Sequence, residues 1–259
     1  MSLETAKAKV EAYQDMGAAG DRTKRILQAL MLYAPTELGR QNMIMDVNSC
    51  DDDVQLKALA DRYLTGLIIP FKTMGGRTPA VSDHPTAPDA DNAEQKNQGA
   101  LQVVHREGKL KDRVLQRDNY RCVITGVRDP ILAHNPSERA KRDPPFLHTI
   151  AAHIVPFSFA PKSESAAKIV QSSKIFEAIS RFGGYPFIDE LGGNINRLEN
   201  VFTLTGDMHT LFGNLEMWLE PVEGNTNTYR IGCVPHFASA LPYGPLITTY
   251  IHGLESAPA

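Results

Sequence analysis

The spacing of apolar residues predicts helices in the first part of the chain. Apolar side chains recur there at intervals of three and four positions, and the clearest series comprises Ile26, Leu27, Leu30 and Met31. A second series over residues 54–64 follows three aspartates at 51–53. We interpret these aspartates as N-cap carboxylates rather than as metal ligands. We therefore expect residues 1–75 to form a helical N-terminal region.

The pattern changes between residues 76 and 99, where Thr, Pro, Ser, Asp, Asn and Gln replace large apolar side chains. This composition predicts a flexible linker. Beyond it the pattern predicts a helix over 108–118 and, over 120–126, a strand that runs into a glycine turn. It then predicts a strand over 148–155, a helix over 164–182, a strand over 201–204, a helix from about 207 and a strand over 228–234. We expect an α+β fold, with residues 100–259 as its second domain.

Composition indicates a packed globular protein, with 42% hydrophobic residues and a formal net charge of -3. No apolar run approaches the roughly 18 residues that a membrane span needs. The N-terminal sequence lacks the apolar core of a secretory signal. The three cysteines, Cys50, Cys122 and Cys233, are far apart, which argues against a disulfide framework. We expect an intracellular protein, cytoplasmic or nuclear, without a membrane partner.

One segment of the chain is basic. Residues 101–147 hold ten basic and six acidic side chains, while the segments on either side are net acidic. Arg113, Arg117 and Arg121 lie close together in it, so they are candidate contacts to phosphates of a nucleic acid. A solvated helix face would show the same pattern, and both interpretations stay open.

Four stretches resemble the HNH endonuclease superfamily, and most closely its fungal HNH-domain branch. They are RDNYRCVITG from residue 117, AAHIVPF from 151, LENVFTL from 198 and MHTLFGNLEMWLEP from 208. The resemblance implies a ββα-metal finger with flanking strands and helices. It places the two histidines and the asparagine of the family on His153, Asn200 and His209. Between the second and third stretches lies a long insert, residues 157–199.

The resemblance implies that such a domain hydrolyses a phosphodiester of a nucleic acid. His153 would deprotonate the attacking water, since a neutral imidazole suits this task at physiological pH. Asn200 would hold the loop between the two strands by hydrogen bonds to backbone and would thereby orient the base. His209 would bind one divalent cation, Mg²⁺, Mn²⁺ or Zn²⁺, that stabilises negative charge in the transition state.

Two departures from the family put the cation in doubt. Ala152 stands directly before the base, where many members carry a ligand, and Gly213 stands one helical turn after His209, where an acidic ligand is usual. A lone imidazole holds Mg²⁺ poorly because this ion prefers oxygen ligands. Asp207 and Asn214 are candidate replacements.

A second function therefore stays open, in which the scaffold has lost its metal site. It would then be a binding protein, or an enzyme without a cofactor that acts on an apolar small molecule, for example a cyclase or pericyclase of fungal secondary metabolism. Trp218 and the aromatic residues of the insert suit stacked bases and apolar ligands equally. The sequence does not define the oligomeric state.

Overall fold

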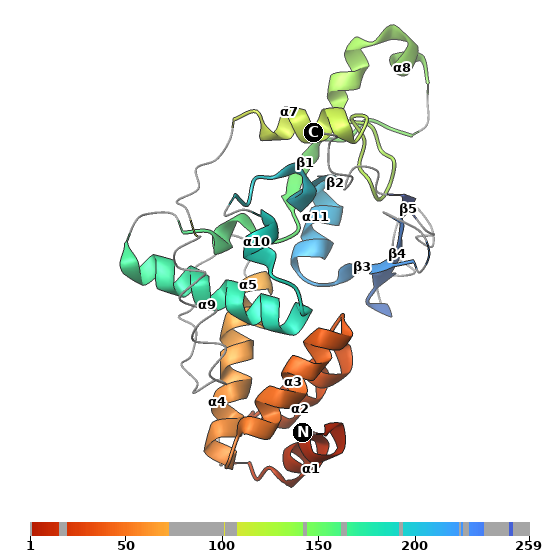
Figure 1. The fold of residues 1–259 in the computed structure, drawn as a ribbon. Helices are drawn as coiled ribbons and strands as arrows, with labels where there is room; N and C mark the ends of the chain where they lie inside the picture. The colour runs from red at the N-terminus through yellow and green to blue at the C-terminus, as the bar shows by residue number, and fades with distance from the viewer. Residues whose placement is uncertain are drawn as a thin grey trace. The chain divides into compact units, whose positions relative to one another are not determined.

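The computed structural model describes residues 2–15, 20–72, 101, 108–141, 144–161, 165–191, 194–222, 224, 228–235 and 249–250. It has an α+β fold of helices and two small antiparallel sheets (Figure 1). The chain forms two compact units. The first, which we call the helical unit, comprises 1–104 and 158–194, and the second comprises 105–157 and 195–259. The linker expected at 76–99 lies outside the described residues.

The N-terminal region of the helical unit is helical, as its apolar spacing predicts. Its elements are α1 (Leu3–Ala12), α2 (Thr23–Tyr33), α3 (Glu37–Ser49), α4 (Asp53–Tyr63), the π-helical turn η1 (Leu64–Ile68) and α5 (Ile69–Lys72). Ser2, Thr36 and Asp52 cap α1, α3 and α4, each accepting a hydrogen bond from a backbone N–H three residues further on. The expectation of an N-cap among the aspartates at 51–53 is thus confirmed at Asp52.

Most of the insert packs with the N-terminal helices. Helix α9 (Ala166–Gly183) contacts α3 and η1, and α10 (Phe187–Leu191) follows it. Gly184 ends α9 with a positive φ of 65°, and a Cβ there would lie 2.4 Å from the backbone nitrogen of Gly39. Only glycine allows this backbone conformation and this close approach. The order along the sequence placed the insert in the second domain, whereas in space residues 158–194 complete the helical unit.

A buried charge network joins α9 to the N-terminal helices. Arg62 donates to Glu177 over 2.6 Å, and both side chains are at least 96% buried. Arg181 donates to Asp46, which also accepts from the hydroxyl of Tyr63 at 2.7 Å. The charges of the two arginines and two carboxylates cancel, so burial leaves no unpaired charge.

The second unit contains a two-stranded sheet followed by a helix. Its elements are α7 (Leu110–Arg117), the 3-10 helix η2 (Pro130–His134), α8 (Pro136–Ala140), β1 (Thr149–His153), the 3-10 helix η4 (Leu198–Asn200), β2 (Val201–Thr205), α11 (Gly206–Gly213), β3 (Met217–Pro221), β4 (Thr228–Cys233) and β5 (Thr249–Tyr250). The 3-10 turn η3 (Phe157–Phe159) follows β1 and spans the boundary with the helical unit. β1 and β2 pair antiparallel, with His153 opposite Val201. β3, β4 and β5 form the second sheet.

In the segment 120–126 the expected strand is wrong, whereas the expected glycine turn is confirmed. The amide of Gly126 donates to the carbonyl of Cys122 at 2.9 Å. Asn119 and Tyr120, where the segment begins, have positive φ angles of 52° and 57°, which a strand cannot accommodate. Cys122 is buried in the core of this unit, beside Ala152 of β1 and Met208 of α11. The apolar residues of this segment therefore pack into the core from a turn rather than from a strand.

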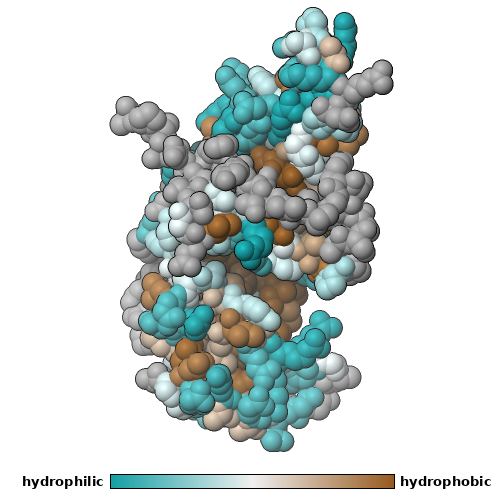
Figure 2. Space-filling view, turned by 90° about the vertical axis from the view of Figure 1, so that its right-hand side faces the viewer, coloured by the Kyte–Doolittle hydropathy of each residue, from teal (hydrophilic) through white to brown (hydrophobic). Residues whose placement is uncertain are grey.

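The surface of the N-terminal helices mixes polar and apolar side chains (Figure 2). Leu32, Tyr33, Leu38 and Val54 are each more than half exposed there. Single exposed apolar residues are ordinary on folded proteins and by themselves indicate no function.

Candidate functional site

The three residues that the sequence singles out lie on the β1–β2 sheet and the helix that follows it. His153 is the last residue of β1, Asn200 immediately precedes β2, and His209 lies in the middle of α11. Pro156 follows β1 and Gly206 begins α11, so the ends of these elements fall where the sequence predicts them. All three residues belong to the same compact unit.

Asn200 ties together the backbone on both sides of the site. Its Oδ1 accepts from the amide of Val155 at 2.8 Å, and its Nδ2 donates to the carbonyls of Val155 and Ile195 at 3.0 and 2.9 Å. Its own carbonyl accepts from the amide of Ile154 at 2.8 Å. The side chain is buried, so these bonds satisfy groups that water does not reach. Asn200 thus holds the turn after β1 against the segment before β2.

His153 contacts a second asparagine. Its Nε2 lies 3.0 Å from Oδ1 of Asn196, and its ring lies 5.7 Å from that of Phe157, centroid to centroid. Burial lowers the pKa of His153, the hydrogen bond to Asn196 acts in the opposite direction, and the charge of nearby His209 lowers this pKa further. The net shift is downward, so the imidazole is neutral at pH 7.

His209 lies on α11, and its charge acts on His153. Its side chain is half-buried, and this burial lowers its pKa below the ordinary value. Asp207 lies in the first turn of the same helix and is exposed. Asn214 caps its C-terminal end and donates to Glu216 at 3.3 Å.

The described residues do not form a donor set for a divalent metal. No group of three or more His, Cys, Asp or Glu side chains comes together among them. Ala152 is buried in the core and Gly213 has no side chain, so neither position beside the two histidines supplies an oxygen ligand. Mg²⁺ and Mn²⁺ prefer oxygen ligands, and Zn²⁺ sites use at least three protein ligands. The described residues therefore do not fit the cation that the family resemblance implies.

The candidate phosphate contacts have mixed surroundings. Arg117 donates to both carboxylate oxygens of Asp118, at 2.8 and 3.1 Å, and to the carbonyls of Leu198 and Val201, at 2.5 and 2.7 Å. Four of its five N–H groups thus hold the unit together. Arg121 pairs with Glu138 at 3.1 Å, and Arg113 lies on the exposed face of α7.

Trp218 lies on β3 of the second sheet. It lies opposite Gly232 on β4, and a Cβ at Gly232 would come within 2.4 Å of its Nε1. The indole donates to Glu220 at 2.8 Å and remains 40% exposed. The indole thus covers Gly232, which has no side chain of its own to pack on this strand.

A cavity of about 300 Å³ lies in the same unit as the histidines. Its apolar lining comes from Ile154, Val201, Phe202, Phe212, Leu219 and Tyr229. Ile154 follows His153 in the chain, and Phe212 lies about one turn after His209 on α11. Arg117 and Glu199 provide the polar part of the lining. A cavity of this size and lining suits one small apolar group.

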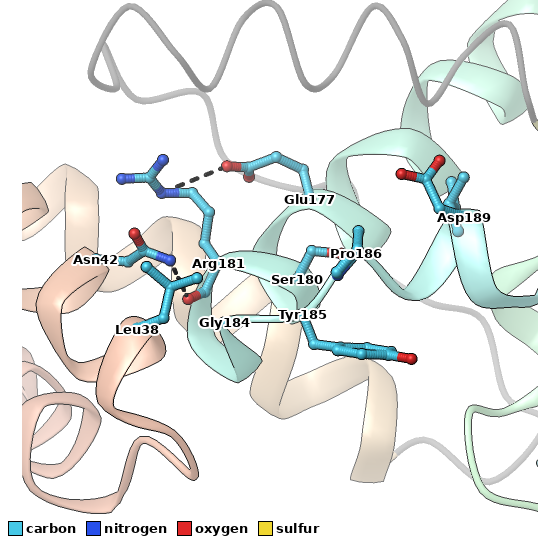
Figure 3. A pocket seen from close by; sticks show the side chains of 10 residues that line it. Leu38, Asn42, Glu177, Ser180, Arg181, Gly184, Tyr185, Pro186 and Asp189 are labelled. Atoms are coloured by element: carbon cyan, nitrogen blue, oxygen red, sulfur yellow. Dashed lines mark hydrogen bonds and ion pairs between the residues drawn. The ribbon is translucent and has the colours of Figure 1, made fainter.

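The helical unit has a separate hollow of about 250 Å³. Figure 3 shows side chains of α3 and α9 around it, with Asn42 bonded to the carbonyl of Arg181 and Glu177 paired with Arg181. Leu38 and Tyr185 expose apolar surface at this hollow. None of the candidate site residues lines it.

Sequence reasoning missed Asn196, whose side chain is 95% buried. The stretch NINRLEN holds three asparagines, and the family resemblance identified only Asn200. A polar amide two residues before a short 3-10 helix gave no signal of a contact with His153, which lies 43 residues away in the sequence.

A two-stranded antiparallel sheet and the helix after it, carrying one histidine on the first strand and one on the helix, define a ββα finger of the HNH type. The family model described as HNH endonuclease matches residues 122–219, which include His153, Asn200 and His209. This part of the chain is thus similar to HNH endonucleases, and we call the second compact unit, residues 105–157 and 195–259, the HNH domain.

No curated protein and no solved structure gave a match. Among the residues that the structure describes, no helix is long and apolar enough to cross a membrane.

Proposed function

We propose that the HNH domain performs nuclease-like hydrolysis of a phosphodiester, with His153 as the general base. The observation that carries this proposal is the pairing of a neutral, anchored imidazole with a second histidine on a finger of the HNH type. Burial lowers the pKa of His153, so its imidazole is free to accept a proton, as a general base must be.

The reaction follows from general acid–base chemistry. The imidazole of His153 takes one proton from a water molecule, and the oxygen of that water bonds to phosphorus. The bond from phosphorus to the leaving oxygen breaks, and the leaving oxygen takes a proton from solvent. Asn200 keeps the backbone of Val155 in place, two residues after the base, so the ring stays where the water would bind.

The divalent cation that the family uses would bind through His209. Asp207 and Asn214, the other candidate ligands, lie at opposite ends of α11. Because this donor set does not fit such a cation, we derive no step of the reaction through it.

A second function is favoured by two observations together. The described residues lack a metal donor set. An apolar cavity is lined by Ile154, the residue directly after His153. The domain would then use the HNH scaffold without a cofactor, as an enzyme or binding protein for an apolar small molecule. In an enzyme, His153 would donate a hydrogen bond or carry a proton. Phe202 and Phe212, whose rings meet at 5.2 Å, would contact the ligand.

Metal binding distinguishes the two functions. Titration calorimetry with Mg²⁺, Mn²⁺ and Zn²⁺ would compare the wild type, His209→Ala and Gly213→Asp. Binding of about one equivalent by the wild type, lost in His209→Ala, would support the nuclease. Binding by Gly213→Asp alone would support the second function.

Cleavage assays test the first proposal directly. The full chain is incubated with plasmid and with single-stranded DNA and RNA, with and without the three metals. Cleavage by the wild type that His153→Ala abolishes supports the nuclease. Intact substrates at high protein concentration in every condition would refute it.

A further inference from the structure

One ring nitrogen of His153, Nε2, makes a hydrogen bond to the protein, and this bond determines which of the two nitrogens carries the proton. Nε2 lies 3.0 Å from Oδ1 of Asn196. An amide oxygen only accepts hydrogen bonds, so the proton of this bond must come from Nε2. A neutral imidazole carries a single ring proton. Nδ1 then holds the lone pair.

We infer that Asn196 is a positioning residue that fixes His153 in the tautomer with the proton on Nε2, which makes Nδ1 the nitrogen that accepts a proton. The inference concerns the state of the imidazole itself. It holds whether the substrate is a nucleic acid or an apolar small molecule. Only its effect on turnover rests on the proposed function.

The segment that carries Asn196 is held rigidly enough for this role. Ile195, directly before it, is buried, and its carbonyl accepts from Nδ2 of Asn200 at 2.9 Å. Arg197, directly after it, accepts at its carbonyl from the amide of Asn200 at 3.0 Å. Asn200 thus fixes the backbone on both sides of Asn196.

The same asparagine also fixes the chain beyond His153. The amide and carbonyl of Val155 both bond to the side chain of Asn200. Asn200 therefore fixes the backbone near both His153 and Asn196. Asn200 acts on the base through Asn196, whereas the family resemblance assigned the orientation of the base to Asn200 itself. Two residues share a role that the sequence gave to one.

An amide and a carboxylate orient the ring alike but differ in charge. Both accept from Nε2, and both therefore select the same tautomer. A leucine in place of Asn196 has the same branched shape and the same number of heavy atoms in its side chain, and it accepts no hydrogen bond. This difference gives a matched set of variants, Asn196→Asp and Asn196→Leu, in which only the acceptor is kept or lost.

Nitrogen chemical shifts of the imidazoles test the inference without any substrate. The full chain is labelled with ¹⁵N-histidine, and long-range ¹H–¹⁵N spectra are recorded near pH 7.5. The His153 signals are assigned from their loss in His153→Gln. A ring nitrogen that bears a proton and one that bears a lone pair give well-separated ¹⁵N shifts, so the spectrum reports the tautomer directly.

We expect the wild type and Asn196→Asp to show a protonated Nε2 and an unprotonated Nδ1 at His153. Asn196→Leu should show averaged shifts, while Asn214→Leu, a control at the end of α11, should match the wild type. A wild-type spectrum with the proton on Nδ1, or with averaged shifts, overturns the inference even if Asn196→Leu does not fold. Wild-type shifts in a folded Asn196→Leu protein would overturn it as well.

Turnover provides a separate readout once an activity is found. We expect Asn196→Leu to lower kcat by about 10²-fold, the lower end of what a positioned general base contributes, with a smaller change in KM. Asn196→Asp should recover part of this loss. If no activity is found, the proposed function fails while the tautomer result stands.

Discussion

Replacing Asn200 by alanine removes three hydrogen bonds from a buried part of the HNH domain. The change leaves the amide of Val155 and the carbonyls of Val155 and Ile195 without their partners, and both residues are at least 97% buried. Each lost bond costs about 1–1.5 kcal/mol when its partner stays buried and unsatisfied. We therefore expect Asn200→Ala to lower the free energy of unfolding of this domain by about 3–4 kcal/mol.

Trp218 makes this loss measurable in the right part of the molecule. It is the single tryptophan of the chain and lies on β3, in the same compact unit as Asn200. Urea unfolding followed by tryptophan fluorescence then reports this unit. With a slope of about 2 kcal/mol per molar urea, the midpoint should fall by roughly 1.5–2 M.

Asn214→Ala is the matched control for this experiment. Asn214 is also an asparagine of the HNH domain, but its side chain is only partly buried and makes one bond of 3.3 Å. Its replacement should change the free energy of unfolding by less than about 1 kcal/mol. A similar small change in Asn200→Ala would show that the bonds of Asn200 do not hold the site, and the reasoning about its role would be wrong.

Three further changes test the packing around the site and in the helical unit. Arg117→Lys loses the forked contact with a carboxylate and two carbonyls, so it should lower the urea midpoint by an amount equivalent to about 2–3 kcal/mol. Gly232→Ala places a methyl group against the indole of Trp218 and should cost about 1–3 kcal/mol, with a red shift of tryptophan emission as the ring moves into water. Arg62→Met leaves the carboxylate of Glu177 buried without its closest partner and should cost about 3–5 kcal/mol in thermal unfolding followed by circular dichroism, while adding Glu177→Leu should restore most of the loss. An additive effect of the last two substitutions would contradict a direct interaction between the two side chains.

Apolar spacing predicted most helices and strands, but it wrongly predicted a strand in the turn at 120–126. The helices before residue 73, α7 and α9, and strands β1, β2 and β4 follow the predicted segments. In the turn, Val123 and Ile124 are apolar and β-branched, which also favours a strand. Asn119 and Tyr120 have positive φ angles at the start of this segment. The segment also makes a contact far along the chain, since the amide of Val123 donates to the carbonyl of Thr203 at 3.0 Å.

The candidate site was predicted in part for a similar reason. A motif places His153, Asn200 and His209, because these residues have fixed positions relative to two strands and a helix. It does not place Asn196, which reaches the base across a long insert. It also gives Arg117 no internal role, whereas the structure directs its guanidinium to Asp118 and to backbone carbonyls. Side-chain contacts between distant segments require the folded structure.

The return of residues 158–194 to the helical unit constrains how the protein is made. Glu177 and its partner Arg62 are 115 positions apart, so the N-terminal helices cannot complete their buried charge network until α9 has left the ribosome. By then β1 of the HNH domain has already been synthesised, but its pairing partner β2 comes after the insert. Neither unit can close during early synthesis, because the helical unit needs α9 and the HNH domain needs β2 and the elements after it. A fragment that ends before α9 would lack Glu177, the partner of Arg62, and would expose apolar faces of the N-terminal helices, which favours aggregation over folding.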